Sequence, residues 1–179
     1  PDNQKTFLAK LLPTGNRAME MEVVASTGKK MILALDTGNA FYSTTHKDVL
    51  ERIGLWDAAK KPKFMRSAFV ASGEVASWTK KMENLTIYGV PVKESYWSII
   101  DAPSSSAEGD GTVGFGFLKN FNITVDYERR RVWLENFTGK AGSEPVGDLG
   151  ISAFWDDNKQ RARVGRVAPD SPADKAGVK

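Results

Sequence analysis

Apolar and polar residues alternate along much of this chain, and this period of two is the feature that most constrains its fold. Residues 18–23 read Ala-Met-Glu-Met-Glu-Val, with a large apolar residue at every second position. Such alternation predicts a half-buried strand rather than a helix. The apolar run at 30–35, Lys-Met-Ile-Leu-Ala-Leu, predicts a buried strand. Further strands are predicted at 64–71, 78–85, 96–100, 122–126 and 131–134, with a tight hairpin at 88–92.

Helical signals are few. Only 47–55 and 117–121 look helical, and 101–111 is a loop rich in Ser, Gly and small residues. Trp133, in an alternating strand, is expected in the core. The fold class is therefore all-β over residues 7–137, with one or two short helices and with closed or sandwiched strands.

The composition changes after residue 137. Residues 138–146 contain Gly, Ser, Lys and Pro and are interpreted as a linker. The remaining segment, 147–179, holds a strand signal and a turn-rich stretch but is too short to bury its own core. It is therefore interpreted as the N-terminal part of a second domain.

Composition excludes several kinds of site. The 179 residues include no cysteine and one histidine, His46, so thiol nucleophiles, cysteine-ligated metals and paired-histidine zinc sites are excluded. The acids Asp101, Glu108 and Asp110 fit no calcium-loop pattern, so no metal and no cofactor is expected. His46 is expected on the surface at a helix start.

The charges suggest no nucleic-acid partner. The net charge is +3, and the dense basic spots at 60–63 and 129–131 are interpreted as solvated loops and turns. No apolar run approaches the roughly 20 residues that a membrane-spanning helix needs, so no membrane span is expected in this chain. The chain begins at Pro1 and displays no signal peptide, so its targeting is not predicted.

Residues 33–38, Leu-Ala-Leu-Asp-Thr-Gly, place a carboxylate where a buried strand ends. A carboxylate there is costly to desolvate unless it is hydrogen-bonded or has a partner. One interpretation is a plain turn, because Asp, Thr and Gly all favour turns. The other is a site at which Asp36 carries chemistry.

Together with the rest of the chain, this motif resembles the aspartic proteases of the retropepsin and pepsin superfamily. Asp36-Thr37-Gly38 matches the catalytic tripeptide of that family. About 75 residues later, 110–114 (Asp-Gly-Thr-Val-Gly) matches the second element, which packs behind the catalytic loop in that family. The short helix around 117–121 and the closing hairpin at 122–134 extend the similarity to about residues 15–136. The resemblance implies a retropepsin-like closed β-barrel in which Asp36, Thr37 and Gly38 are catalytic and Val113 and Gly114 support their loop.

The chain departs from the family pattern at two positions. Asn39 stands where Ala or Ser is usual, and Thr112 stands where Ile or Leu is common. Asn39 is expected close enough to the Asp36 carboxylate to alter its hydrogen bonding.

The family also has a hairpin flap over the substrate, and the best candidate is 70–75, with Gly73 at the tip between Ser72 and Glu74. The alternative is an ordinary surface hairpin.

A second resemblance lies in the tail. Residues 147–151, Gly-Asp-Leu-Gly-Ile, look like the loop with which PDZ domains hold a peptide's terminal carboxylate, and 164–177 look like a strand-and-helix segment of bacterial PDZ domains. This implies Leu149, Gly150 and Ile151 as a carboxylate-binding loop, although 147–151 could also be a plain turn. The whole chain resembles a bacterial aspartyl protease with a C-terminal PDZ domain. A periplasmic or secreted setting is suggested by that resemblance alone.

Peptide hydrolysis of this kind needs two carboxylates around one water, and the chain has one Asp-Thr-Gly. We expect the second Asp36 to come from an identical chain in a homodimer, the alternative being an N-terminal lobe. The predicted function is an aspartic endopeptidase that acts on a peptide or protein substrate. The rival prediction is a non-catalytic peptide- or protein-binding module on the same scaffold.

Overall fold

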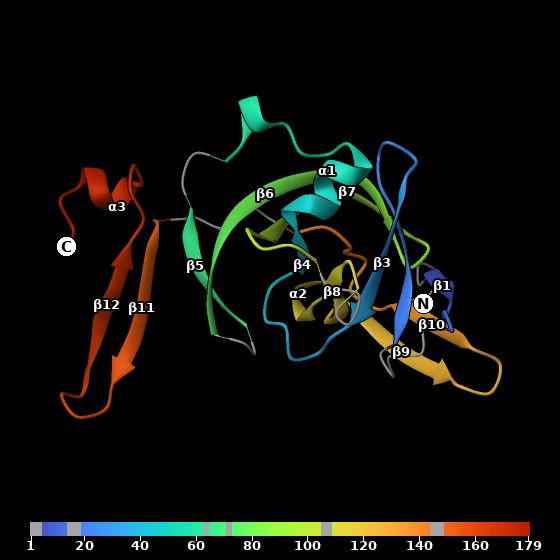
Figure 1. Ribbon diagram of the computed structural model, residues 1–179. Coiled ribbons are helices and arrows are strands. Elements are labelled where there is room, and N and C mark those ends of the chain that lie inside the picture. The colour runs from blue at the N-terminus through green and yellow to red at the C-terminus, as the bar shows by residue number, and fades with distance from the viewer. Residues whose placement is uncertain (1–4, 14–18, 63–64, 71–72, 105–108, 144–148) are drawn as a thin grey trace.

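The computed structural model describes residues 5–13, 19–62, 65–70, 73–104, 109–143 and 149–179. These residues form mostly β-structure, and six strands close into a barrel (Figure 1). The strands are hydrogen-bonded in the order β2-β3-β8-β4-β7-β6, and a further pairing of β2 with β6 completes the ring. The barrel strands are β2 (Glu20–Val24), β3 (Lys30–Leu35), β4 (Ser43–His46), β6 (Gly73–Ile87), β7 (Val90–Ile100) and β8 (Gly111–Val113). The predicted β-rich fold class is confirmed at this level.

The alternation in the sequence accounts for the barrel core. Met21 and Val23 of β2 are fully buried, whereas Glu22 between them is half-buried and lies 2.8 Å from Lys30 in an ion pair. The predicted strand at 30–35 coincides with β3, and the hairpin predicted at 88–92 joins β6 to β7. Tyr88 takes a positive φ of 53° in that turn. In β3 and in residues 21–24 of β2, alternate residues therefore face the barrel interior.

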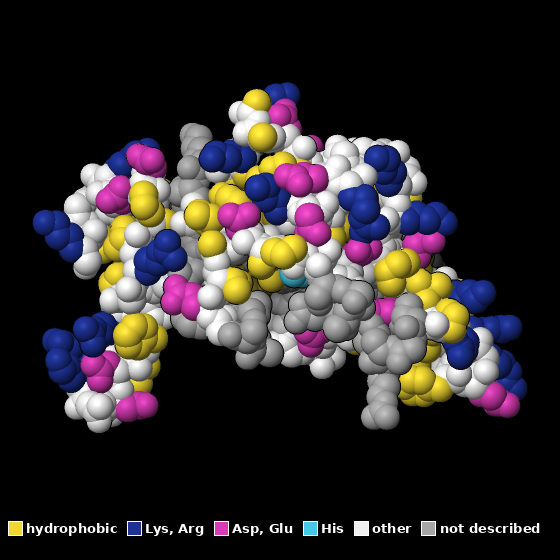
Figure 2. Space-filling model, in the orientation of Figure 1, with side chains coloured by type: hydrophobic (Ala, Val, Ile, Leu, Met, Phe, Trp, Pro, Cys, Tyr) yellow, Lys and Arg dark blue, Asp and Glu magenta, His cyan; other side chains and the backbone are white. Residues whose placement is uncertain are grey.

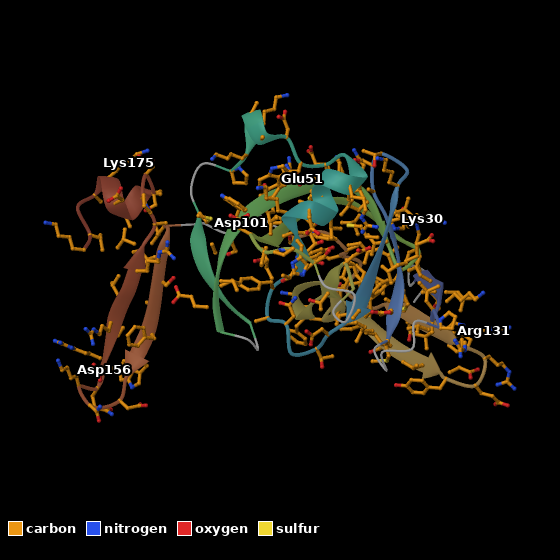
Figure 3. All side chains as sticks on the ribbon, viewed as in Figure 1. Lys30, Glu51, Asp101, Arg131, Asp156 and Lys175 are labelled. Carbon is orange, nitrogen blue, oxygen red and sulfur yellow. The ribbon has the colours of Figure 1, made fainter. Side chains whose placement is uncertain are left out.

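In the part of the chain that the structure describes, three short helices and one 3-10 turn accompany the strands. Helix α1 (Lys47–Ile53) buries Val49, Leu50 and Ile53, which lie on one face at helical spacing. It ends at Gly54, whose φ of 77° is favourable for glycine. Glu51 points away from the barrel on the opposite face (Figure 3). The others are the 3-10 turn η1 (Ala58–Lys60), α2 (Phe115–Leu118) and α3 (Pro172–Lys175).

A second sheet flanks the barrel. Strands β1 (Lys5–Lys10), β10 (Arg131–Asn136) and β9 (Phe121–Asp126) pair antiparallel in that order. Val132 and Leu134 face the core, while Leu8 and Trp133 are opposite each other on the outer face. The core position predicted for Trp133 is therefore wrong: the side chain is half-buried, because it lies on the same face of β10 as exposed Arg131.

His46 is at the predicted helix start but not on the surface. It immediately precedes α1, is 7% exposed, and its Nδ1 lies 3.0 Å from the carbonyl oxygen of Ala102. The surface prediction is wrong because His46 is also the last residue of β4, which pairs with β7 on one side and β8 on the other.

Residues 138–143 contact the barrel. The amide of Tyr96 donates to Ser143 Oγ at 2.8 Å, and the Tyr42 hydroxyl donates to the Ala141 carbonyl. A Cβ on Gly142 would lie 2.5 Å from the Glu94 carbonyl oxygen, so glycine allows this close approach. The segment interpreted as a linker thus begins packed against β7, and residues 144–148 lie outside the described part.

The tail forms a separate hairpin. Strands β11 (Ile151–Asp156) and β12 (Arg161–Val167) pair antiparallel beside β5 (Arg66–Val70), and α3 follows (Figure 1). The Ser171 side chain caps α3 by accepting from the Asp174 amide. Among the helices of the described ranges, none has the length and apolar character required to cross a membrane.

Candidate functional site

Asp36 lies where β3 leaves the barrel. Strand β3 runs parallel to β8, with Ala34 opposite Thr112 and Leu35 opposite Val113. The Asp36 amide then donates to the Val113 carbonyl oxygen at 3.0 Å and continues this ladder by one residue. The two sequence motifs, 74 positions apart, therefore lie side by side in space.

The loop after Asp36 holds the carboxylate. The Gly38 amide donates to Asp36 Oδ1 at 2.9 Å, and the Asn39 amide donates to the Asp36 carbonyl at 3.3 Å. Asp36 is half-buried, whereas Thr37 and Gly38 are exposed. One carboxylate oxygen is thus oriented by backbone, in a loop whose outer side faces solvent.

The second motif packs directly behind this loop. Three backbone amides in succession, those of Gly114, Phe115 and Gly116, donate to carbonyl oxygens of Tyr42, Asn39 and Phe41 at 2.8–3.1 Å. Val113, just before them, is fully buried. A Cβ on Gly114 would lie 2.2 Å from the Phe41 oxygen, and one on Gly116 would lie 2.7 Å from the Tyr42 Cα. Because Gly114 and Gly116 have no side chains, the backbone of residues 114–116 can approach that of residues 39–42 to hydrogen-bonding distance.

Asn39 is bonded to the scaffold. Its Nδ2 donates to Thr112 Oγ1 at 2.7 Å and to Thr44 Oγ1 at 3.0 Å, and its Oδ1 accepts from the Phe41 amide at 2.9 Å. Asn39 and Thr112, the two departures from the family pattern, are therefore direct partners. The expectation that Asn39 alters hydrogen bonding at the Asp36 carboxylate stays a prediction.

Asp110 has a structural role that the sequence analysis missed. Its Oδ2 accepts from the Ile32 amide at 2.9 Å, its own amide donates to the Ile32 carbonyl, and its Oδ1 pairs with Arg52 of α1. The hydrogen bond that Arg52 donates to the Asp110 carboxylate raises the pKa of the guanidinium. Asp110 thus joins the start of β8 to Ile32 in the middle of β3, four residues before Asp36. A conserved spacing to Arg52 in related chains would have been the signal for this pair.

The predicted flap coincides with a hairpin. Strands β5 and β6 pair with Val70 opposite Gly73, and Gly73 has a φ of 120°, which glycine tolerates. The tip position predicted for Gly73 is therefore wrong, because Gly73 is the first residue of β6 and is paired in the ladder. Ser72 lies outside the described residues. Glu74 is exposed, and its Oε1 lies 3.8 Å from Arg166 Nη1 of β12. The flap hairpin is thereby in contact with the C-terminal hairpin.

The loop predicted to bind a carboxylate is at the start of β11. The Gly150 carbonyl accepts from the Ala168 amide at 2.7 Å, and the Leu149 carbonyl accepts from the Ala173 amide at 3.1 Å. Gly150 has a φ of 73°, and the Leu149 side chain is 63% exposed. Ile151 begins β11. The loop therefore joins β11, β12 and α3 through its carbonyl groups.

The surface charges are mixed. Figure 2 shows basic and acidic side chains interspersed over the visible face. Within the described ranges, no three His, Cys, Asp or Glu side chains are grouped so that they could hold a metal ion.

Comparisons with known proteins give no family for this chain. No family model matches the sequence, and no curated protein matches it.

Proposed function

We propose that this protein is an aspartic endopeptidase with a retropepsin-like barrel. The observation that carries the proposal is the backing of the Asp36 loop: β3 and β8 run parallel, and the amides of residues 114–116 bond to the carbonyls of residues 39–42. This arrangement holds a half-buried carboxylate at a strand end, beside exposed Thr37 and Gly38. A plain turn at residues 36–38 would not require Gly114 and Gly116 in close contact with the backbone that follows it.

The proposed chemistry uses a pair of carboxylates and one water. One carboxylate takes a proton from the water, whose oxygen forms a bond to the scissile carbonyl carbon, while the protonated partner donates to the carbonyl oxygen. The C–N bond then breaks: the departing nitrogen takes the proton that the first carboxylate removed from water, and the proton on the former carbonyl oxygen returns to the other carboxylate as the carbonyl re-forms. Two carboxylates about 3 Å apart share one proton and titrate as a coupled pair.

The second carboxylate would come from a second copy of the chain. In a two-fold symmetric dimer, a residue near the axis meets its own counterpart, so one Asp36 per chain is sufficient. The exposure of Thr37 and Gly38 leaves this loop accessible to another chain. Phe115, which is bonded to the loop through its amide, is 53% exposed and gives that surface an apolar component. A further lobe bearing an equivalent acid remains the alternative source.

The hairpin of β5 and β6 would serve as the flap. Gly73 begins its second strand, and closure over a bound peptide would exclude water from the carboxylates. The C-terminal hairpin would be the first part of a PDZ-like unit, in which a peptide adds as a strand beside β11 and its terminal carboxylate contacts the loop at 149–151.

The experiment that tests the proposal is peptide hydrolysis by the Asp36→Asn variant across pH 3–7. Loss of cleavage by at least about a hundredfold is expected, because the neutral amide cannot accept the proton from water. Asp57→Asn is the matched control, since Asp57 is an exposed acid that caps η1. Unchanged cleavage by Asp36→Asn would rule out the mechanism.

A non-catalytic binding module is the second candidate. The exposed side chains of Phe154 and Trp155 on β11 favour it, because neighbouring exposed aromatic residues are common where proteins bind partners. A statine-type transition-state mimic separates the two candidates. It binds a paired carboxylate site, and a module without catalysis would not bind it.

A further inference from the structure

The side chain of Asn39 joins three parts of the molecule at the Asp36 loop. Its amide nitrogen bonds to hydroxyls on two neighbouring strands, Thr112 of β8 and Thr44 of β4, which are paired with each other in the sheet register. Its amide oxygen accepts from the Phe41 amide within the loop. Both donors of the side chain and its oxygen are therefore used.

The backbone of the same residue adds two further bonds. The Asn39 amide donates to the Asp36 carbonyl, and the Asn39 carbonyl accepts from the Phe115 amide at 2.8 Å. Asn39 thus connects the residue that carries the carboxylate to the segment that backs the loop.

Gly114 provides the space for this side chain. A Cβ at position 114 would lie 2.9 Å from Asn39 Cγ and 2.7 Å from the Asn39 carbonyl oxygen. An amide that is partly buried, fully bonded and in contact with a glycine has a single orientation, because any rotation breaks bonds to both threonines.

We propose that Asn39 is a positioning residue for Asp36, acting through the clamp formed by Asn39, Thr44 and Thr112. This inference rests on the proposed function. The clamp fixes the loop before substrate or a second chain arrives, so that the Gly38 amide and the Asp36 carboxylate keep their 2.9 Å hydrogen bond. A catalytic carboxylate must be held in a fixed position, because a displacement of about 1 Å can lower the rate about a hundredfold.

The first test is the Asn39→Ala variant. Its kcat should fall about 10- to 100-fold while its KM changes less than about threefold, since Asn39 orients the reacting group. Asn120→Ala is the matched control: Asn120 is a buried asparagine that donates to the Gly116 and Phe117 carbonyls, and Thr138 Oγ1 donates to its amide oxygen. The control should lower stability and leave kcat within about threefold of wild type. An Asn39→Ala enzyme with the kcat of wild type would overturn the inference.

The second test does not depend on proteolysis. Amide hydrogen exchange at Gly38 should be about tenfold faster in Asn39→Ala than in wild type, with no such change in Asn120→Ala. If the wild-type protein cleaves no peptide but Gly38 exchange responds in this way, the proposed function fails and the clamp stands. Unchanged exchange at Gly38 contradicts the clamp whatever the activity.

Thr112→Val keeps the test usable if Asn39→Ala does not fold. Valine preserves the shape of threonine and removes one of the two acceptors of the Asn39 amide. Like Asn39→Ala, Thr112→Val should lower kcat and speed amide exchange at Gly38, but by smaller factors than Asn39→Ala. Because both variants remove the same bond, the effects should be less than additive in the double variant, and full additivity would contradict the assignment.

Discussion

The sharpest structural prediction concerns Gly114. A methyl group at this position would lie 2.2 Å from the Phe41 carbonyl oxygen and 2.7 Å from that of Asn39. Non-bonded heavy atoms rest at about 3.5–4.0 Å, so the two segments would have to separate by more than about 1 Å. Both obstructing atoms belong to the backbone, and no side-chain rotation relieves the contact.

The expected cost of Gly114→Ala follows from two opposing effects. Overpacking in a well-packed region costs about 1–3 kcal/mol or more. Alanine also restricts the unfolded chain, which stabilises by about 0.4–1 kcal/mol, and the extended backbone at Gly114 (φ −98°, ψ −178°) permits alanine without strain. A net loss of about 1–2 kcal/mol or more is expected. Because the Asp36 loop rests on Gly114, cleavage should fall about a hundredfold.

Urea unfolding and peptide hydrolysis measure these two effects. Gly165→Ala is the matched control, since the close contacts of a Cβ there are with the ring of Phe154, an exposed side chain that can turn aside, and the Ser152 carbonyl oxygen lies at an ordinary 3.7 Å. The control should lose less than about 0.5 kcal/mol and keep its cleavage rate. Wild-type stability and activity in Gly114→Ala would refute the close packing of the two motifs.

Three further predictions address other contacts. Asp110→Ala should lower the free energy of unfolding by about 2–3 kcal/mol in urea, because it leaves the Ile32 amide and Arg52 without their partner; a loss below about 0.5 kcal/mol would contradict its role. Desolvation raises the pKa of Asp48, but hydrogen bonds from Ser104 and the Val49 amide, together with nearby His46, outweigh it and hold the pKa below its ordinary value. The bonds of ionised Asp48 therefore stabilise the fold near neutral pH and are lost as the pH falls below about 4. Asp48→Asn should therefore be less stable than wild type at pH 7 and lose less on going to pH 2.5 in urea unfolding, and parallel pH profiles would argue against this. Phe115→Glu should leave the barrel folded, since the side chain is exposed, but should give monomers in sedimentation and abolish cleavage; a dimeric Phe115→Glu protein would exclude this face as the interface.

Burial imposes a regular apolar pattern on β2 and β3, so these strands could be predicted from the sequence, whereas only parts of the longest strands, β6 and β7, were predicted. Residues 30–35 became β3 with the predicted bounds, and the apolar positions of β2 face the core. Strands β4 and β8 were not predicted, since three or four residues are too few to show a period of two. Both strands form because neighbouring strands supply their hydrogen bonds. Strand β4 pairs with β7 and β8, and β8 also pairs with β3.

The candidate site could be predicted only in part, because a local pattern locates Asp36 but does not report contacts between distant segments. Asp36 was found from its place at the end of an apolar run, but its environment depends on contacts between distant segments. The bonds of Asn39 to Thr112 and of Asp110 to Arg52 span 73 and 58 positions. Glu20, on the polar side of an alternating strand, is buried, and a Cβ on Gly109 would lie 3.0 Å from its Oε1. Such burial comes from a segment that folds over the strand, which local periodicity does not report.

The claim that Asp36 works only with a second Asp36 is tested most directly by mixing wild-type and Asp36→Asn chains under conditions that allow subunits to exchange. If each active unit needs two intact carboxylates, an equal mixture contains about one quarter wild-type dimers, so the cleavage rate per total protein should be about one quarter of the wild-type rate. A rate of about one half, as expected for chains that act independently, would contradict the account.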